Sequence, residues 1–335
     1  MLTRRHIRLV LLALFVLTYA VFTYGEAAEK TNDSSTLPTY RSIVSQVQVT
    51  FFATDENNHP VAALTKSDFA VVDNGLVIRN FRSFTAADDT SLDVVALVDL
   101  SESVAPRFRV AVREVEQLVA RERSIAGDNL AVLYFGAEFG ATSGATSGAA
   151  SRAVSGEIRP AILCASGCRA SDSVRSLLTV KSGGATPLFD ALIFASDFIS
   201  HHRRAGARPV LILFSDGNDT ISLHSAREAL DAVVAGGALI YSVDMVKPDM
   251  VKPANPPAGS MFLRQVSDSS GGRYFPLQDG DVMNTVLEDL RASYVVTYDL
   301  PSQQAGFHSL RLMPTHNVNL RFHSRNRYYD EPSLR

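Results

Sequence analysis

The chain reads Val94-Val95-Ala96-Leu97-Val98-Asp99-Leu100-Ser101-Glu102-Ser103, an apolar run that ends in a loop rich in oxygen-bearing side chains. A near-continuous aliphatic run is typical of a strand that is covered on both faces. Three further runs of this kind follow, at Leu130 to Phe135, Val210 to Phe214 and Ala238 to Val243. The pattern predicts an α/β fold with a doubly wound, mostly parallel, Rossmann-like sheet.

Helical patterns separate these runs. Apolar residues recur at helical spacing from Phe108 to Val119, and three further segments have a helical pattern: Pro187 to Ser200, Ser222 to Ala235 and Val282 to Arg291. In a doubly wound sheet of order 3-2-1-4-5-6, the first and fourth strands are neighbours, and ligands bind in the crevice outside their carboxyl ends. We therefore expect the functional residues at the ends of the strands that precede Asp99 and Asp216.

Strand-like segments flank this unit on both sides. Alternation from Ser42 to Asp55 predicts a half-buried strand, and Asn74-Gly75 predicts a tight hairpin turn between Phe69–Val72 and Leu76–Phe84. Three strands are expected after the unit, at Tyr294 to Leu300, His308 to Met313 and Val318 to Tyr329. Because three strands alone are marginally stable, we expect both flanks to combine into one smaller β domain.

The amino terminus indicates export. A basic start precedes an apolar stretch from Leu9 to Tyr24, as in a signal peptide, although the stretch is long enough to remain as a membrane anchor. We expect a periplasmic or secreted protein, with no other membrane contact. The expected organisation is a signal or anchor at 1–27, a linker at 28–40, β-domain halves at 41–90 and 293–330, and the α/β domain at 91–292.

The composition excludes some partners and metals. The net charge of -3 comes from 32 basic and 35 acidic residues, so no strong positive field favours nucleic acid. Cys164 and Cys168 are the only cysteines, too few for a structural zinc site, and they form either a local disulfide or a free pair. The segment 137–156, rich in Gly, Ser, Ala and Thr, cannot pack a core and is expected to be a flexible loop.

Five residues form a candidate metal site. Asp99 and Asp216 end strands that we expect to lie about 4.8 Å apart, where two carboxylates repel unless a cation or proton lies between them. Ser101, Ser103 and Thr186 add neutral hydroxyl oxygens. An all-oxygen set with few carboxylates suits Mg²⁺, with Mn²⁺ and Ca²⁺ as alternatives. Because much of this shell is neutral, the ion is expected to bind a further carboxylate, supplied by a partner.

The set Asp99-x-Ser101-x-Ser103, Thr186 and Asp216 resembles the metal-ion-dependent adhesion site of von Willebrand factor A (VWFA) domains. The resemblance implies that the two serines ligate the metal directly and that the threonine and the aspartates bind it directly or through water. It also implies that an Asp or Glu of a protein ligand completes the shell.

The resemblance extends to the flanks. The segments Pro60 to Gly75 and Tyr294 to Tyr298 resemble those of bacterial exported VWFA-related proteins, which are abundant in acidobacteria. This wider resemblance implies an extracytoplasmic protein of the bacterial cell envelope.

The sequence predicts a protein-binding module and not an enzyme. No HExxH helix, GxSxG elbow or phosphate-binding GxxxxGK[ST] loop occurs. Magnesium phosphotransferases of the DxD kind need a second carboxylate at the position of Ser101. Two alternatives stay open, an envelope protein that the metal only stabilises and a Mg²⁺-dependent hydrolase. Two simpler readings also stay open, in which Thr186 caps a helix and Ser215 to Asp219 form only a turn.

Overall fold

The computed structural model describes residues 46–87, 90–122, 129–136, 160–168, 174–246, 255–276, 282–301 and 305–330. The chain from Ser45 to Arg335 forms one compact unit. The expected signal segment and the loop at 137–156 lie outside the described residues, so those two interpretations stay predictions.

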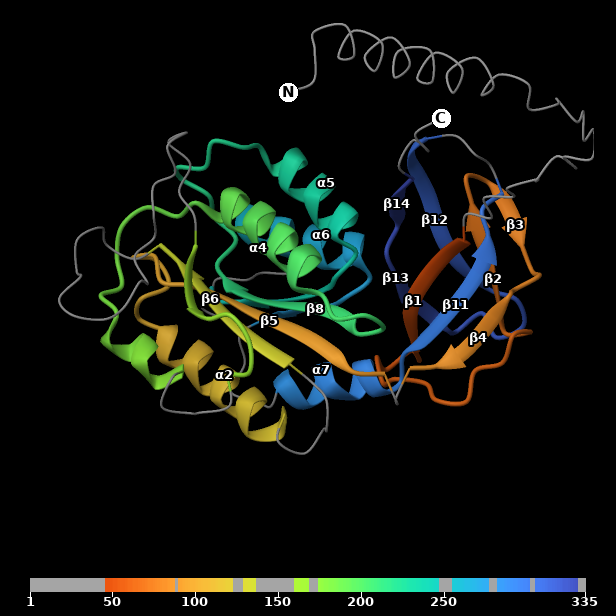
Figure 1. Cartoon of the computed structure of the whole chain (residues 1–335), viewed down its shortest axis with the longest axis horizontal. Helices are drawn as coiled ribbons and strands as arrows, with labels where there is room; N and C mark the ends of the chain where they lie inside the picture. The colour runs from red at the N-terminus through yellow and green to blue at the C-terminus, as the bar shows by residue number, and fades with distance from the viewer. Residues whose placement is uncertain are drawn as a thin grey trace, which may run out of the picture. The chain divides into compact units, whose positions relative to one another are not determined.

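A six-stranded sheet of order β10-β9-β8-β5-β6-β7 forms the centre of the α/β part (Figure 1). Its strands are β5 (Leu92–Asp99), β6 (Asn129–Phe135), β7 (Ala161–Cys164), β8 (Arg208–Ser215), β9 (Leu239–Asp244) and β10 (Tyr274–Pro276). All neighbouring pairs are parallel except β6 and β7. Numbered along the chain, this is the order 3-2-1-4-5-6, and the α/β fold class predicted from the sequence is confirmed.

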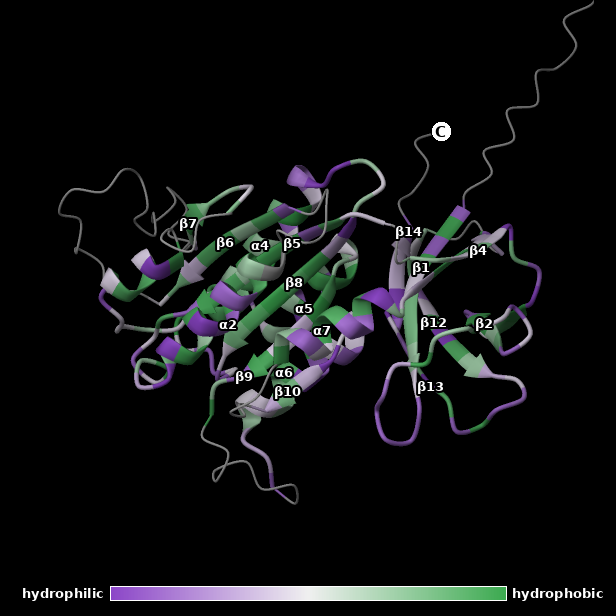
Figure 2. Ribbon diagram, turned by 90° about the horizontal axis from the view of Figure 1, so that it is seen from below, coloured by the Kyte–Doolittle hydropathy of each residue, from purple (hydrophilic) through white to green (hydrophobic). Residues whose placement is uncertain are grey.

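Helices cover both faces of this sheet (Figure 1). On one face, residues of α2 (Phe108–Glu122) and α7 (Val282–Arg291) join one core cluster with strand residues. On the other face, α4 (Leu188–His202), α5 (Ala226–Gly236) and α6 (Ala258–Ser270) join a second cluster. A short 3-10 helix, η1 (Ser176–Thr179), precedes α4. The central strands β5, β8 and β9 are buried at every residue and strongly hydrophobic (Figure 2), as a sheet between two helical layers requires.

The flanking segments form two antiparallel-paired sheets, as expected for a smaller β domain. One has the order β13-β1-β11-β4 and the other β14-β12-β2-β3. The strands are β1 (Gln46–Thr54), β2 (Phe69–Asp73), β3 (Leu76–Ile78), β4 (Ser83–Ala86), β11 (Tyr294–Asp299), β12 (Gly306–Pro314), β13 (Arg321–Ser324) and β14 (Arg327–Asp330). Each sheet combines strands from before and after the α/β part, and the two sheets enclose an aromatic core centred on Phe51 and Phe69.

Two predicted strands are each divided in two. Leu76 to Phe84 becomes β3 and β4, which lie in different sheets, because Phe81 turns inward and stacks on Phe69 with ring centroids 5.2 Å apart. Val318 to Tyr329 becomes β13 and β14, divided where Arg325 forms a bridge with Ser270. The predicted hairpin turn is present, with φ of 45° at Asn74 and 83° at Gly75.

Two strands and one α-helix were not predicted, and neither was the 3-10 helix η1. Strands β7 and β10 are edge strands of only 4 and 3 residues. Helix α6 contains four serines and a glycine, which are weak helix formers, so its sequence has little helical signal.

Cys164 and Cys168 form a disulfide with their Cα atoms 6.0 Å apart. Among the described residues, no helix combines the length and the apolar character needed to span a bilayer.

Candidate metal centre

The first loop of the site follows β5. Asp99 has no exposed surface, and Ser101 is 1% exposed. One carboxylate oxygen of Asp99, Oδ1, accepts a hydrogen bond from the Ser101 backbone N–H at 2.8 Å. The hydroxyls of Ser101 and Ser103 are hydrogen bonded at 3.2 Å, and Ser103 itself is exposed. The loop therefore presents its oxygen atoms in a series that leads from the core to the surface.

The second loop carries Thr186. Gly183 and Gly184 have positive φ angles, and the Gly183 N–H donates to the Leu100 carbonyl at 2.8 Å, which joins this loop to the first. Thr186 is 4% exposed. The residue that precedes helix α4 is Pro187, with no side-chain cap, so the helix-cap reading of Thr186 is wrong.

The third loop follows β8 and carries Asp216. Its carboxylate accepts a hydrogen bond from the Asn218 N–H at 3.1 Å, and 3% of the residue is exposed. Thr220 joins this loop to the second, because its N–H donates to the Thr186 carbonyl at 2.9 Å and its hydroxyl accepts from the Thr186 N–H at 2.7 Å. The segment after β8 is thus tied to the rest of the site and is more than a local turn.

The surroundings of Asp99 disfavour the charged form of its carboxyl group. Burial raises its pKa to about 6, and the neighbouring Asp216 carboxylate acts in the same direction. Hydrogen bonds from Ser215 and Ser101 lower the pKa and offset part of this effect. The Ser215 hydroxyl donates to Asp99 Oδ2 at 2.7 Å. Asp99 thus has two donors and a repelling carboxylate, and in the described part of the chain neither aspartate is in an ion pair.

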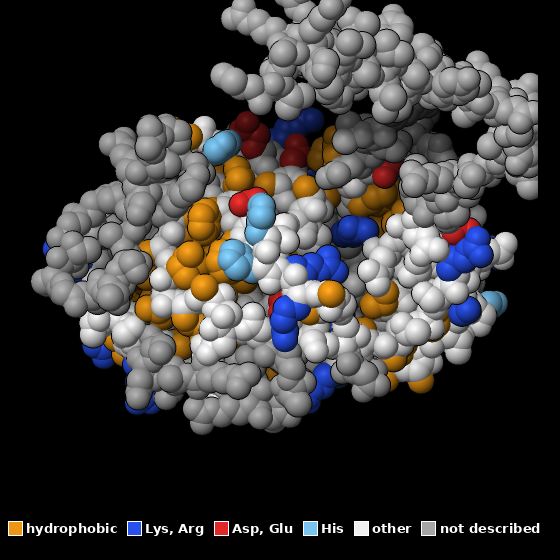
Figure 3. All heavy atoms as spheres, in the orientation of Figure 1, with side chains coloured by type: hydrophobic (Ala, Val, Ile, Leu, Met, Phe, Trp, Pro, Cys, Tyr) orange, Lys and Arg blue, Asp and Glu red, His pale blue; other side chains and the backbone are white. Residues whose placement is uncertain are grey.

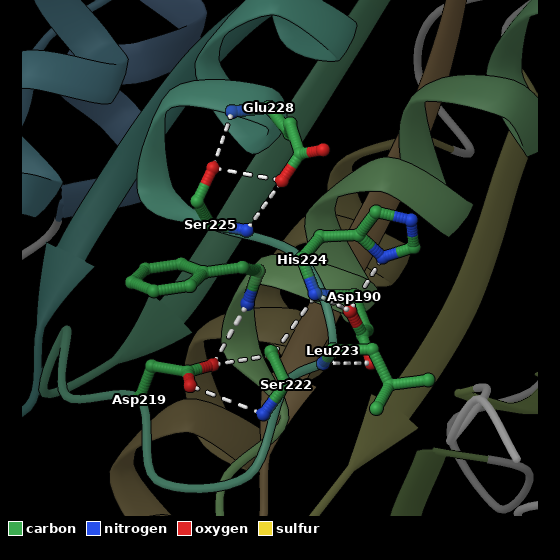
Figure 4. A network of polar contacts seen from close by, with 8 residues as sticks. Asp190, Asp219, Ser222, Leu223, His224, Ser225 and Glu228 are labelled. Carbon is green, nitrogen blue, oxygen red and sulfur yellow. Dashed lines mark hydrogen bonds and ion pairs between the residues drawn. The ribbon is translucent and has the colours of Figure 1, made fainter.

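A polar network fixes the third loop on the start of α4 (Figure 4). The Asp219 carboxylate accepts from the Phe189 N–H at 3.1 Å, and the Ser222 hydroxyl accepts from the Asp190 N–H at 3.1 Å. Asp190, in turn, accepts from the backbone N–H groups of Leu223 and His224, both at 3.1 Å. These bonds satisfy free N–H groups of the first helical turn and hold the loop that carries Asp216. The Asp219 carboxylate thus joins the loop after β8 to the first turn of α4.

Sequence reasoning missed two supporting residues. Ser215 was considered only as part of a turn, although its hydroxyl binds Asp99. Gly136, directly after β6, has φ of 75°, and a Cβ there would lie 2.7 Å from the Ser101 N and 3.1 Å from Asp99 Oδ1. A glycine directly after a buried strand was the available signal for this close approach.

The five candidate ligands lie on three loops that hydrogen bonds join to one another at the carboxyl edge of β5 and β8. Their donor set is two carboxylates and three hydroxyls, which fits a hard divalent cation. Among the described residues, no three His, Cys, Asp or Glu side chains cluster as a metal-binding group, so any site here depends on the hydroxyls.

Comparison with known proteins gives weak similarities only. No family model and no curated protein matches the sequence. Among solved structures, BatB from Bacteroides thetaiotaomicron is 14% identical, with a TM-score of 0.39 over 60% of this chain and 97% of that chain. The SpRpn10 VWA domain is 13% identical, with a TM-score of 0.38 over 60% and 93%. A manganese-loaded TRAP protein from Plasmodium vivax is 14% identical, with a TM-score of 0.40 over 79% and 98%. Similarities this weak indicate neither a function nor a metal for this chain.

Proposed function

We propose that this protein is a binding module that holds a divalent cation, Mg²⁺ by preference, at Asp99, Ser101, Ser103, Thr186 and Asp216. One observation carries the proposal. Two buried carboxylates from neighbouring strands act on each other, and no described cationic side chain pairs with either. A cation would offset their repulsion and draw the three hydroxyls into its shell. When bound, the ion would act as a Lewis acid that accepts one more anionic oxygen.

We propose that this oxygen belongs to an Asp or Glu of a protein partner. The surroundings of the site support a protein partner, because three large apolar side chains are exposed nearby, two on a loop and one on helix α6. Ile221 and Leu223, on the loop after Asp216, are 44% and 64% exposed. Met261 is 57% exposed at the start of α6, where Gly259 contacts Gly217. An acidic residue with apolar neighbours would bury these side chains while its carboxylate reached the ion.

We also propose that the module is exported and that the domain boundaries are those expected from the sequence, with the α/β domain at 91–292. The Cys164–Cys168 disulfide supports export, because such bonds persist in oxidising compartments. The basic and apolar amino terminus supports it independently.

The test is capture of partners from the envelope fraction of the source organism on immobilised protein. We expect specific proteins to bind in Mg²⁺, to elute in EDTA and to be absent from an Ser101→Ala column. Matched controls are Ser200→Ala, which removes a hydroxyl that donates to a helix carbonyl away from the site, and the circular dichroism spectrum of each variant. Equal capture in EDTA, or by Ser101→Ala, would overturn the proposal.

The two alternative functions predict different results. A metal that only stabilises the fold would raise the melting temperature without any Mg²⁺-dependent partner. A hydrolase would release phosphate from a substrate in Mg²⁺. The site favours binding over hydrolysis because the position two residues after Asp99 is a serine, which is too weak an acid to protonate a leaving group.

A further inference from the structure

A cavity lies at the opposite edge of the parallel sheet, where its strands begin. Its volume is about 410 Å³, within the range of roughly 300–1,000 Å³ that small-molecule sites occupy. One wall is the segment before β8 and the α5–β9 turn, and the other is the sheet β13-β1-β11-β4. The polar side chains in its lining include Arg203, Arg208, Arg325, Thr50, Thr85 and Thr90. None of the described residues that line it is Asp or Glu.

Arg325 is held rigidly beside this cavity. Its Nη2 donates to the Gln48 carbonyl at 2.8 Å, and its guanidinium carbon lies 5.3 Å from the centre of the Tyr328 ring. The absence of a side chain at Gly271, directly after α6, lets the backbone of Arg325 come close to this helix. A Cβ at Gly271 would lie 2.6 Å from the Arg325 N. The Nε atom of Arg325 is buried and has no hydrogen-bond partner in the described part of the chain. A buried positive charge is costly, and an anion bound beside this guanidinium would offset that cost.

Arg203 brings a second positive charge to the same cavity. It follows α4, it is exposed, and its Nε donates to the Ala207 carbonyl at 3.2 Å. Burial lowers the pKa of Arg325, and the positive charge of Arg203 lowers it further. The Asp73 carboxylate attracts Arg325, but it accepts hydrogen bonds from Tyr298 and Tyr328 within the β part. Basic side chains gather on this face where α4 and α5 meet the β strands (Figure 3).

We propose that this cavity binds the phosphate group of a small molecule. Arginines line both walls, and Thr50 of β1 and Thr85 of β4 line the same cavity. Donors from several directions suit a tetrahedral anion with several acceptor oxygens, whereas a planar carboxylate is satisfied by one guanidinium. The site is separate from the candidate metal centre, which lies at the carboxyl edge of the sheet.

The test is thermal unfolding of the full chain with increasing inorganic phosphate, at constant ionic strength and in EDTA. We expect the melting temperature of the wild type to rise by a few degrees and to saturate, since a ligand that binds only the folded state stabilises it. Arg325→Gln and Arg203→Gln should each reduce the apparent phosphate affinity at least tenfold. Arg82→Gln, which removes an exposed arginine that pairs with Asp299, is the matched control and should respond like the wild type.

Three results would overturn the phosphate proposal: no saturable increase, an equal increase in Arg203→Gln, or a larger increase with citrate than with phosphate. If Arg325→Gln fails to fold, Arg203→Gln carries the test, because its side chain is exposed and in no recorded ion pair of the described chain. Ser101→Ala should keep the full phosphate response, so failure of the metal site and failure of the phosphate site are distinguishable.

Discussion

Asp73 and Asp99 are both carboxylates without exposed surface, yet their surroundings differ. Asp73 Oδ2 accepts from the Tyr298 and Tyr328 hydroxyls at 2.8 and 2.7 Å, and the bond to Tyr298 connects the two sheets of the β part. Asp99 has a second carboxylate beside it and a path of hydroxyls that ends at exposed Ser103. The other oxygen of Asp73, Oδ1, lies 3.4 Å from His308 Nδ1. A buried carboxylate with tyrosine and histidine neighbours stabilises a fold, whereas one beside another carboxylate at a loop edge is suited to bind a cation.

The largest expected effect is the loss of stability when Asp73 is replaced. Asp73→Ala leaves two buried tyrosine hydroxyls without their acceptor, so we expect it to lower the free energy of unfolding by about 3–5 kcal/mol. Chemical denaturation measures this loss, which should be the same in Mg²⁺ and in EDTA. Asp73→Asn, which keeps one acceptor oxygen, should lose less. A cost below about 1 kcal/mol for Asp73→Ala would remove the structural role that the comparison gives to Asp73.

Acid should weaken the β part independently of the metal. Burial lowers the pKa of His323, which stacks on Phe52 at 4.5 Å, to about 4, with the charges of Arg273 and Arg321 acting in the same direction. Between pH 6.5 and 4 the unfolded chain therefore takes up a proton that the folded chain does not, and stability falls as the pH falls.

Between pH 7 and pH 4, we expect the free energy of unfolding to fall by roughly 2–3 kcal/mol less in His323→Gln than in the wild type, since one pKa unit corresponds to about 1.4 kcal/mol. Denaturation curves of both proteins between pH 4 and 7 measure it. The difference between them should not change with Mg²⁺. A His323 contribution that disappears in Mg²⁺ would contradict the separation of the two regions.

A substitution of Gly136 tests the metal-centre half of this comparison. Gly136→Ala introduces a Cβ 2.7 Å from the Ser101 N at a residue with φ of 75°, so it should cost about 2 kcal/mol and displace the first loop. Mg²⁺ affinity, measured by calorimetry, should fall with it. The matched control is Gly75→Ala, which has φ of 83° but no atom within 4 Å of the added Cβ and lies in the β part. If both variants keep full Mg²⁺ affinity, Gly136 does not support the site.

The smallest expected effect is the most specific. Asp216→Asn removes one of two repelling charges but keeps the acceptor oxygen for the Asn218 N–H. In EDTA we expect a gain in stability of about 0.5–1 kcal/mol, and in Mg²⁺ a loss relative to the wild type. Thermal melting in both conditions shows whether the sign reverses. A loss in EDTA would mean that Asp216 serves the fold in the way that Asp73 does.

Much of the α/β part is predictable from the sequence, because strands buried on both faces must be apolar over their whole length. Val94 to Val98 and Val210 to Phe214 show this directly, and the right-handed connections between them restrict the order of strands. Asp99 and the two serines follow the first run and Asp216 follows the second, so their place at one edge of the sheet is predictable as well.

Other features depend on contacts between distant parts of the chain. The division between β13 and β14 occurs where Arg325 meets Ser270, and nothing in the local sequence indicates it. Ser215 binds Asp99 across two strands that are 116 residues apart in the chain. Such contacts exist only in the folded chain, and α6 is likewise helical because its apolar side packs on the sheet.

Calorimetric titration of the metal-free full chain with Mg²⁺ tests the central claim most directly, because it needs no knowledge of the partner. We expect one saturable site per chain in the wild type, no binding by Asp99→Ala and at least tenfold weaker binding by Ser101→Ala, with unchanged binding by the Ser200→Ala control. Absence of saturable Mg²⁺ and Mn²⁺ binding by the folded wild type, or wild-type affinity in Asp99→Ala, would contradict the claim that these oxygen atoms hold a cation.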